Sequence, residues 1–217
     1  MRARPISREA LVEELAELIS DRPPADHVRV AVDGAPAARP EGLADELVAP
    51  LRLRGRPVVR VSAGDFLRPA SLRLEYGRTD PDAFYDDWLD VKALRREVLD
   101  ASETGRVLPA LWDSSIDRAY RAPYEELPPG GVVLVDGTLL LGRGLAFEVS
   151  VHLWLSRGAL ERGTPEDERW KLPAYERYER ETDPQLSADV VVRSDHPARL
   201  AVLVPDGTGT RGRGGAH

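Results

Sequence analysis

Three aspartates follow apolar runs that are typical of buried strands. Asp33 is the aspartate of "VRVAVDG", Asp136 is the aspartate of "GVVLVDG", and Asp65 follows "PVVRVSAG". In open α/β sheets, ligands bind at the carboxyl ends of parallel strands, so these three side chains would share one rim. Neighbouring carboxylates raise one another's pKa and could supply a general acid or base, or bind a divalent cation. Turn formation at strand ends would use the same residues without any chemistry.

The loop after Val28–Val32 has the layout of a phosphate loop without its residues. Counted from Gly34, the pattern G-x-x-x-x-G-K-[ST] puts its second glycine, lysine and hydroxyl on Arg39, Pro40 and Glu41. Such a loop binds through backbone N–H groups, a lysine and a hydroxyl that holds magnesium. Pro40 has no N–H, and Glu41 adds a negative charge. We therefore expect no cofactor, and Mg-ATP only if Arg39 replaces the lysine.

Composition narrows the partners. The chain has 217 residues, of which 42% are hydrophobic, so we expect one α/β domain over residues 1–205 and a flexible Gly-rich tail over 206–217. No apolar run approaches the roughly 18 residues of a membrane span, which favours a soluble, cytoplasmic protein without a membrane partner. The absence of cysteine excludes disulfides and thiolate sites. The net charge of -7 argues against nucleic acid and favours a small-molecule ligand. A homodimer stays open.

Strands alternate with helical patterns along the chain. The expected strands are Val28–Val32, Pro57–Ser62, Gly131–Gly137, Val149–Leu155 and Ala188–Arg193. The expected helices are one capped by Ser7 that runs to Ile19, then Glu41–Leu53, Val91–Ala101 and Pro165–Glu181. Uninterrupted Val and Leu runs predict an α/β fold with a doubly wound, mainly parallel sheet and helices on both faces. Arg106–Pro129 breaks this rhythm, so we expect it to form a small inserted hairpin or lobe near the carboxyl edge.

The order of these segments resembles the uridine kinase-like branch of the P-loop nucleoside kinases. The resemblance covers about His27 to Val204 and rests on "VAVDG" with "LADEL", "GRPVVRVSAGDFLRP", "GRTDPDAFYDDWLDVKALRREVLD", "LWDSSIDR", "VVLVDGTLLL" and "DPQLSADVVV". It implies ATP on the phosphate loop and phosphorylation of a hydroxyl on a nucleoside or similar small molecule. The chain departs from the pattern beyond the loop as well. Gly64 stands where that family has a catalytic aspartate, and the lid segment "SRGALERGTPEDERW" is short.

The segments that resemble the substrate pocket keep their polar and aromatic residues. We predict catalytic carboxylates at Asp65, Asp113 and Asp136. We predict substrate contacts by Asp33, Phe66, Arg68, Tyr85, Trp88, Trp112 and Arg118. Ordinary core packing and a solvated surface would use the same residues. No metal site is predicted, because the histidines lack metal-ligand spacing. His152 lies within a predicted strand and could face a cleft, although a lone histidine is more often structural.

Three functions stay open from the sequence, in descending order. The first is an enzyme that works without ATP and uses carboxylates and arginines of the former acceptor pocket for an elimination, cyclisation, isomerisation or hydrolysis. The second is a non-catalytic pseudokinase that binds a metabolite or a protein partner. The third is a residual ATP-dependent kinase of a nucleoside or other small molecule. The kinase ranks last because its glycine, lysine, hydroxyl and aspartate positions have all changed.

Overall fold

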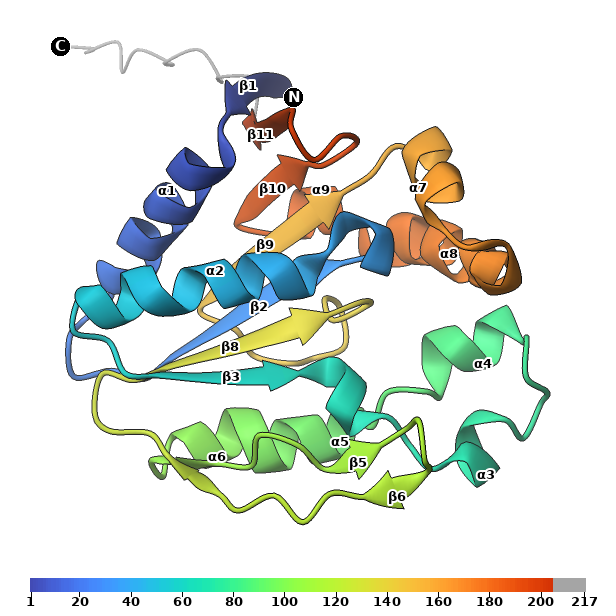
Figure 1. The fold of residues 1–217 in the computed structure, drawn as a ribbon, viewed down its shortest axis with the longest axis horizontal. Coiled ribbons are helices and arrows are strands. Elements are labelled where there is room, and N and C mark those ends of the chain that lie inside the picture. The colour runs from blue at the N-terminus through green and yellow to red at the C-terminus, as the bar shows by residue number, and fades with distance from the viewer. Residues whose placement is uncertain (205–217) are drawn as a thin grey trace, which may run out of the picture.

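The fold is built on one seven-stranded sheet. The computed structural model describes residues 1–204, and the predicted tail lies outside the described residues. The strand order is β1-β11-β10-β9-β2-β8-β3 (Figure 1). The strands are β1 (Arg2–Ile6), β2 (Val28–Gly34), β3 (Val58–Ser62), β8 (Val132–Gly137), β9 (Val149–Trp154), β10 (Val190–Arg193) and β11 (Leu200–Val204). The five strands from β10 to β3 are parallel, which confirms the predicted fold class.

The five predicted strands form this parallel centre, with ends that differ by at most two residues from the expected ones. The sequence did not predict β1 and β11, which pair antiparallel at the sheet's edge from Arg2 with Val204 to Ile6 with Leu200. β1 is almost wholly exposed and contains Pro5, which a ladder tolerates only at its edge. Such a strand has no apolar run to predict it.

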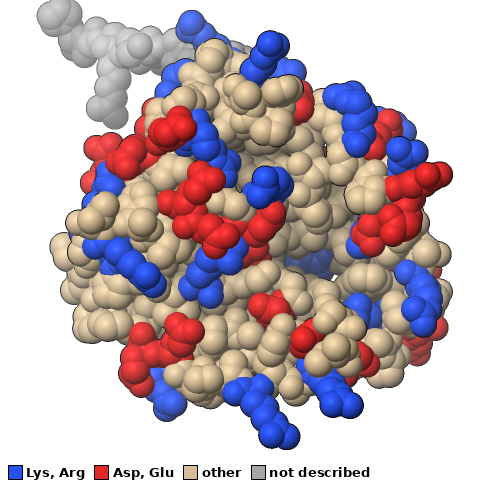
Figure 2. Space-filling model, in the orientation of Figure 1, with Lys and Arg blue, Asp and Glu red and all other residues tan. Residues whose placement is uncertain are grey.

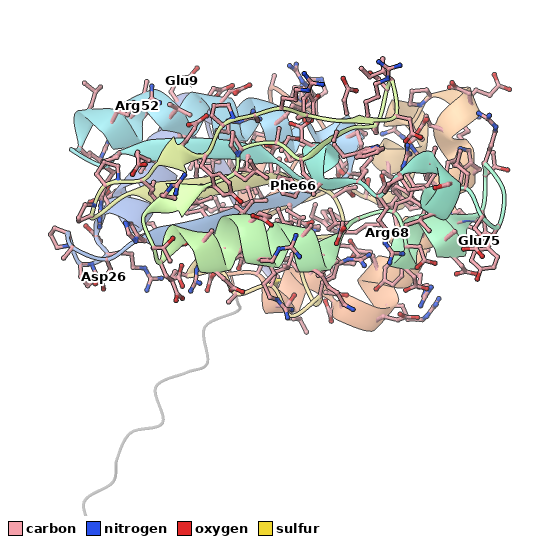
Figure 3. The ribbon with its side chains drawn as sticks, turned by 90° about the horizontal axis from the view of Figure 1, so that it is seen from below. Glu9, Asp26, Arg52, Phe66, Arg68 and Glu75 are labelled. Atoms are coloured by element: carbon pink, nitrogen blue, oxygen red, sulfur yellow. The ribbon has the colours of Figure 1, made fainter. Side chains whose placement is uncertain are left out.

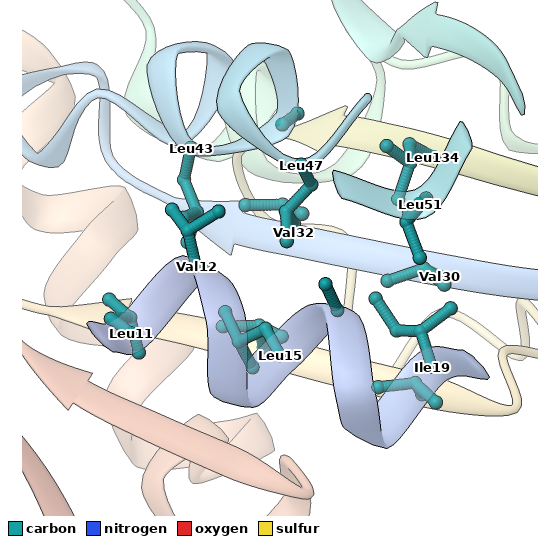
Figure 4. Packing of buried hydrophobic residues seen from close by; sticks show 14 of the residues in the cluster. Leu11, Val12, Leu15, Ile19, Val30, Val32, Leu43, Leu47, Leu51 and Leu134 are labelled. Carbon is teal, nitrogen blue, oxygen red and sulfur yellow. The ribbon is translucent and has the colours of Figure 1, made fainter. Parts of the chain in front are cut away.

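Helices α1 (Arg8–Ser20) and α2 (Pro40–Leu53) cover one face of the sheet. The hydroxyl of Ser7 accepts the N–H of Ala10 at 3.2 Å, which confirms the predicted cap. Figure 4 shows the apolar side chains of both helices packed against side chains of β2 and β8. The helices contribute Leu11, Val12, Leu15, Ile19, Leu43, Leu47 and Leu51, and the strands contribute Val30, Val32 and Leu134. Burial stabilises the fold by roughly 1.5–3 kcal/mol for each large side chain.

The opposite face is covered by shorter and less regular helices. The predicted helix at 91–101 forms as α5 (Val91–Leu94), a π-helical turn (Arg95–Leu99) and α6 (Asp100–Ser102). The predicted helix at 165–181 begins as a 3-10 helix (Glu166–Lys171) and continues as α8 (Leu172–Thr182), which has a proline in its first turn. The unpredicted helices are α3 (Ala70–Arg73), α4 (Pro81–Asp86), α7 (Arg157–Gly163) and α9 (Pro184–Ser187). They are too short for a periodic signal.

The predicted insertion is a long hairpin made of two short ladders. β4 (Arg106–Val107) pairs with β7 (Glu125–Glu126), and β5 (Trp112–Asp113) pairs with β6 (Arg118–Ala119). The hairpin lies beside β3 at the lower side of Figure 1. Within residues 1–204, no helix combines the length and the apolar composition needed to cross a bilayer.

Arg39 generates a stability prediction. It joins a 3-10 turn (Pro36–Ala38) to α2 with φ 57° and ψ 58°, a left-handed conformation that costs a non-glycine residue roughly 1–2 kcal/mol. We expect Arg39→Gly to raise the free energy of unfolding by about 1 kcal/mol, part of the gain being offset by the greater freedom of unfolded glycine. Urea denaturation measures this. Arg39→Ala keeps the conformational cost, so a glycine variant no more stable than the alanine variant would contradict the prediction.

Candidate active site

Asp33 is the centre of a buried polar network at the end of β2. It is completely buried and faces His152, its Cα partner on β9. The Nδ1 atom of His152 lies 2.6 Å from Oδ2 of Asp33, and the Tyr178 hydroxyl on α8 donates to the same oxygen at 3.0 Å. The other oxygen, Oδ1, accepts the N–H of Leu140 at 2.9 Å. Both oxygens therefore have partners, as a buried carboxylate requires.

A strained turn after β8 directs two backbone N–H groups into this network. Leu139 has φ 59° although it is buried. Directly after it, Leu140 donates to Asp33, and Leu141 donates its N–H to the Tyr178 hydroxyl at 2.9 Å. Left-handed backbone at a non-glycine residue costs about 1–3 kcal/mol and concentrates at functional sites. The turn holds Asp33 and Tyr178 in fixed positions.

His152 combines deep burial with an unpartnered nitrogen. Burial alone would lower its pKa, but the hydrogen bond to Asp33 and the nearby Glu179 carboxylate outweigh burial and raise the pKa to about 9. The ring is therefore positively charged at neutral pH, with a proton on each nitrogen. Among the described residues, Nε2 has no hydrogen-bond partner, and Oε1 of Glu179 lies 3.7 Å away. This nitrogen is buried and has hydrogen-bonding capacity that the described residues leave unused.

His152 lies on the wall of a cavity of about 290 Å³ between β9, α7 and α8, which we call the His152 cavity. Its polar wall consists of Arg157, Glu161, Glu176 and Glu179, together with Thr138, Tyr175 and Tyr178. Its apolar wall includes Leu153, Leu155, Leu160 and Leu172. The volume suits a small molecule, and the position at the carboxyl edge of the sheet is the usual one for ligands in such folds. Figure 2 shows that the molecule is hollowed at this edge.

The loop at the phosphate-loop position has few backbone donors to offer. The N–H groups of Ala38 and Arg39 donate to the carbonyls of Ala35 and Pro36 at 2.8 and 3.0 Å, inside the loop itself. Pro36 and Pro40 have no N–H. Gly34 and Ala35 line the His152 cavity, and Pro36 lines two neighbouring cavities. The start of the loop therefore presents apolar surface to these cavities.

Asp136, at the end of β8, is paired with an arginine. Nη2 of Arg60 lies 3.0 Å from Oδ1 of Asp136, at an angle that does not make a hydrogen bond. The same guanidinium donates to the carbonyl of Glu41 at 3.0 Å, and its Nε lies 3.1 Å from Asp45. Burial raises the pKa of Asp136 to about 6 against the opposing effect of Arg60. Arg60 thus links Asp136 to the backbone of Glu41.

Asp113 lies in the inserted hairpin and Asp65 lies near it, and the charge of Arg60, the partner of Asp136, also acts on Asp65. Burial raises the pKa of Asp65, while a hydrogen bond from Tyr120 lowers it and Asp113 raises it. Asp113 accepts the N–H and hydroxyl of Ser115 at 2.9 and 2.6 Å, and these bonds lower its pKa. Neither aspartate lines the cavities described above. The catalytic role of Asp65, Asp113 and Asp136 therefore stays a prediction, and these cavities give it no support.

Of the predicted substrate contacts, Trp88 lines a cavity. This second cavity, of about 170 Å³, also contains Arg143 and Lys171. The Cζ atoms of Arg177 and Arg143 lie 4.2 and 5.0 Å from the centre of the Tyr85 ring. Trp88 packs against the ring of Phe84, and Tyr85 packs against the ring of Tyr178 on α8. Their predicted contact with substrate stays a prediction.

Most of the other residues predicted to contact substrate are buried or have partners inside the protein. Phe66 is fully buried in the core (Figure 3), so the expectation that it contacts substrate is not met. Arg68 pairs with Asp87 at 3.2 Å, and the Trp112 indole donates to Asp117 at 3.0 Å. Arg118 is exposed on β6. Asp33 is enclosed too, and its side chain contacts His152.

Sequence reasoning left His152 undecided and missed Tyr178 and Glu179. A polar residue inside an uninterrupted apolar strand was the available signal for His152. For α8, the signal was that Tyr175, Tyr178 and Glu179 share one helical face by their spacing. Neither signal names a partner, because the register of β9 against β2 brings His152 to Asp33.

The raised pKa of Asp136 predicts a pH-dependent stability. An acid whose pKa is higher in the folded protein favours folding when protonated, so its contribution is lost as pH rises from about 4 to about 6. Asp136→Asn cannot ionise. We expect it to exceed the wild type in unfolding free energy by about 1–3 kcal/mol at pH 7.5 and to match it at pH 4. Urea denaturation at both pH values tests this. A variant less stable than the wild type at pH 7.5 would show that the Arg60 pair outweighs burial.

Comparison with known proteins identifies the fold. No protein-family model and no curated protein matches the chain. A "Possible Uridine Kinase from Bacillus stearothermophilus" matches with a TM-score of 0.69 and 19% identity over 83% of this chain and 96% of that chain. A "putative fructose transport system kinase from Silicibacter sp. TM1040" matches with a TM-score of 0.57 and 24% identity over 82% and 90%. Identities this low show fold and not activity. The chain has the P-loop kinase-like fold of these proteins, which confirms the resemblance at that level.

Proposed function

We propose that this protein is an enzyme that uses a P-loop kinase-like fold without a nucleotide. It catalyses a proton-transfer reaction on a small molecule, within the classes of elimination, cyclisation, isomerisation and hydrolysis. The supporting observation is the buried Asp33–His152 pair, in which His152 lines the His152 cavity and its buried Nε2 has no hydrogen-bond partner among the described residues. This proposal keeps the nucleotide-free enzyme expected from the sequence. It moves the chemistry from the three predicted carboxylates to a histidine.

The geometry assigns a role to each member of the network. Asp33 accepts the Nδ1 proton of His152, which orients the ring and leaves the Nε2–H as the reactive group. Tyr178 and the N–H of Leu140 hold Asp33 in place. His152 starts as an acid, because its pKa of about 9 keeps it protonated at neutral pH. Glu179, 3.7 Å from Nε2, stabilises the charged ring, and the ring serves as the base once it has given up its proton. Acid–base catalysis of this kind contributes roughly 10²–10⁴-fold.

The binding reading is supported by a different aspect of the same network. Asp33, Tyr178 and Glu179 are all close enough to fix the histidine as a structural cation. In that case the cavity would hold a metabolite without turning it over, as in a pseudokinase. Detection of product separates the two functions, because both predict binding and only one predicts turnover.

The loop geometry predicts weak nucleotide binding. We expect no micromolar binding of Mg-ATP or Mg-GTP in calorimetric titrations, because the loop has few free N–H donors and Glu41 adds a carboxylate. The variant Arg39→Gly, Pro40→Lys and Glu41→Thr serves as the matched control and should gain measurable affinity. A micromolar dissociation constant for the wild type would revive the kinase reading.

The catalytic role is tested by a metabolite screen with product detection, followed by variants on the substrate that is found. We expect His152→Gln to lower kcat about a hundredfold or more, as loss of a general acid does. Asp65→Asn and Asp113→Asn are controls and should stay within about threefold of the wild type, since neither residue lines the cavity. The opposite pattern, with His152→Gln active and the aspartate variants inactive, would return the chemistry to the carboxylates. Binding without product would support the pseudokinase.

A further inference from the structure

We infer that the His152 cavity selects a hydrophobic amine, a small molecule with a protonated amino group and an apolar or aromatic body. The inference rests on the proposed function for the identity of the site, and it adds the chemical class of the ligand. It follows from three properties of the cavity wall: its net charge, an available carboxylate oxygen and the apolar surface opposite them.

The charges around the cavity leave it negative. Glu161, Glu176 and Glu179 line it together with a single arginine, Arg157. That arginine is shared, with Nε 2.9 Å from Glu161 and Nη2 3.2 Å from Glu176. The buried Asp33 and the protonated His152 offset each other, so three carboxylates face one guanidinium. Loss of the His152 proton would make the balance more negative still. A phosphate or carboxylate ligand is disfavoured in both states.

Glu179 has the position needed to bind an ammonium group. Its Oε2 accepts from Gln185 at 3.3 Å, and its Oε1 lies 3.7 Å from Nε2 of His152, beyond hydrogen-bonding distance. The side chain is 40% exposed, so a ligand can reach it. An ammonium group at Oε1 would form a charge-assisted hydrogen bond beside the reactive nitrogen. A hydroxyl or carbonyl next to the amino group would then meet the Nε2–H of His152.

The remaining wall suits an apolar body. Leucines from β9, α7 and α8 surround the cavity, and the Tyr175 ring lies among them. Ala35, at the start of the former phosphate loop, adds a small apolar side chain where a phosphate site needs donors. A cavity of about 290 Å³ accommodates one ring or a short alkyl chain rather than a nucleotide.

The test compares three probes of nearly equal size on the full-length protein: 2-phenylethylamine, 2-phenylethanol and phenylacetate. Calorimetry at pH 7.5 should show the amine binding at least tenfold more tightly than the alcohol, with no measurable binding of phenylacetate. The preference for the amine should weaken with added salt. Equal binding of amine and alcohol, preferred binding of phenylacetate, or binding of none of the three would overturn the inference.

Variants on α8 locate the interaction. Glu179→Gln should lower the affinity for the amine at least fivefold and leave the affinity for the alcohol unchanged. Glu181→Gln is the matched control, since Glu181 lies on the same helix but pairs with Arg177 outside the cavity. An unchanged amine affinity in Glu179→Gln would overturn the assignment. Amine binding without any His152-dependent turnover would leave this inference standing and refute the proposed catalysis, whereas turnover of an anionic substrate would do the reverse.

Discussion

The contact between Asp33 and His152 organises the carboxyl edge of this sheet. It crosses from β2 to β9, and Tyr178 and the turn after β8 bind to the same carboxylate. Removal of one partner from a buried ion pair typically costs 3–5 kcal/mol, because the other charge is left unpaired. Three strands and α8 are therefore held in one arrangement by a single buried carboxylate. The His152 cavity exists where these elements meet.

The loop after β2 and the cluster around Asp136 both lack features that a nucleotide site needs. A nucleotide site needs backbone donors and a metal ion, and this chain has an apolar loop and a resident guanidinium in their places. The Arg60 side chain contacts Asp136, Asp45 and the carbonyl of Glu41 at the same time. The acidic wall beside His152 continues this trend away from anions. Together these features support an enzyme whose fold has kept its shape but not its nucleotide.

The sequence predicted the parallel sheet and its main helices well, because long apolar runs and capped amphipathic patterns follow from local physics. The edge strand β1 escaped prediction because it is exposed and carries no such pattern, whereas β11 was missed although it is a short apolar run. The site was harder. Asp33, Asp65 and Asp136 end or follow strands as expected, but tertiary contacts decide which carboxylate faces a cavity. Asp33 supports His152, Asp136 meets Arg60, and Asp65 lies with Tyr120. Strand register and helix packing set these contacts, and a short sequence motif predicts neither of them.

The most direct test of the account is an NMR titration of the His152 imidazole in the wild type and in Asp33→Asn. The account predicts a pKa of about 9 in the wild type, because Asp33 and Glu179 outweigh burial. In Asp33→Asn, the strongest partner is neutral and burial dominates, so the pKa should fall toward or below the ordinary value of about 6.5. A wild-type pKa at or below 6.5, unchanged in the variant, would contradict the charged pair on which the proposed site depends.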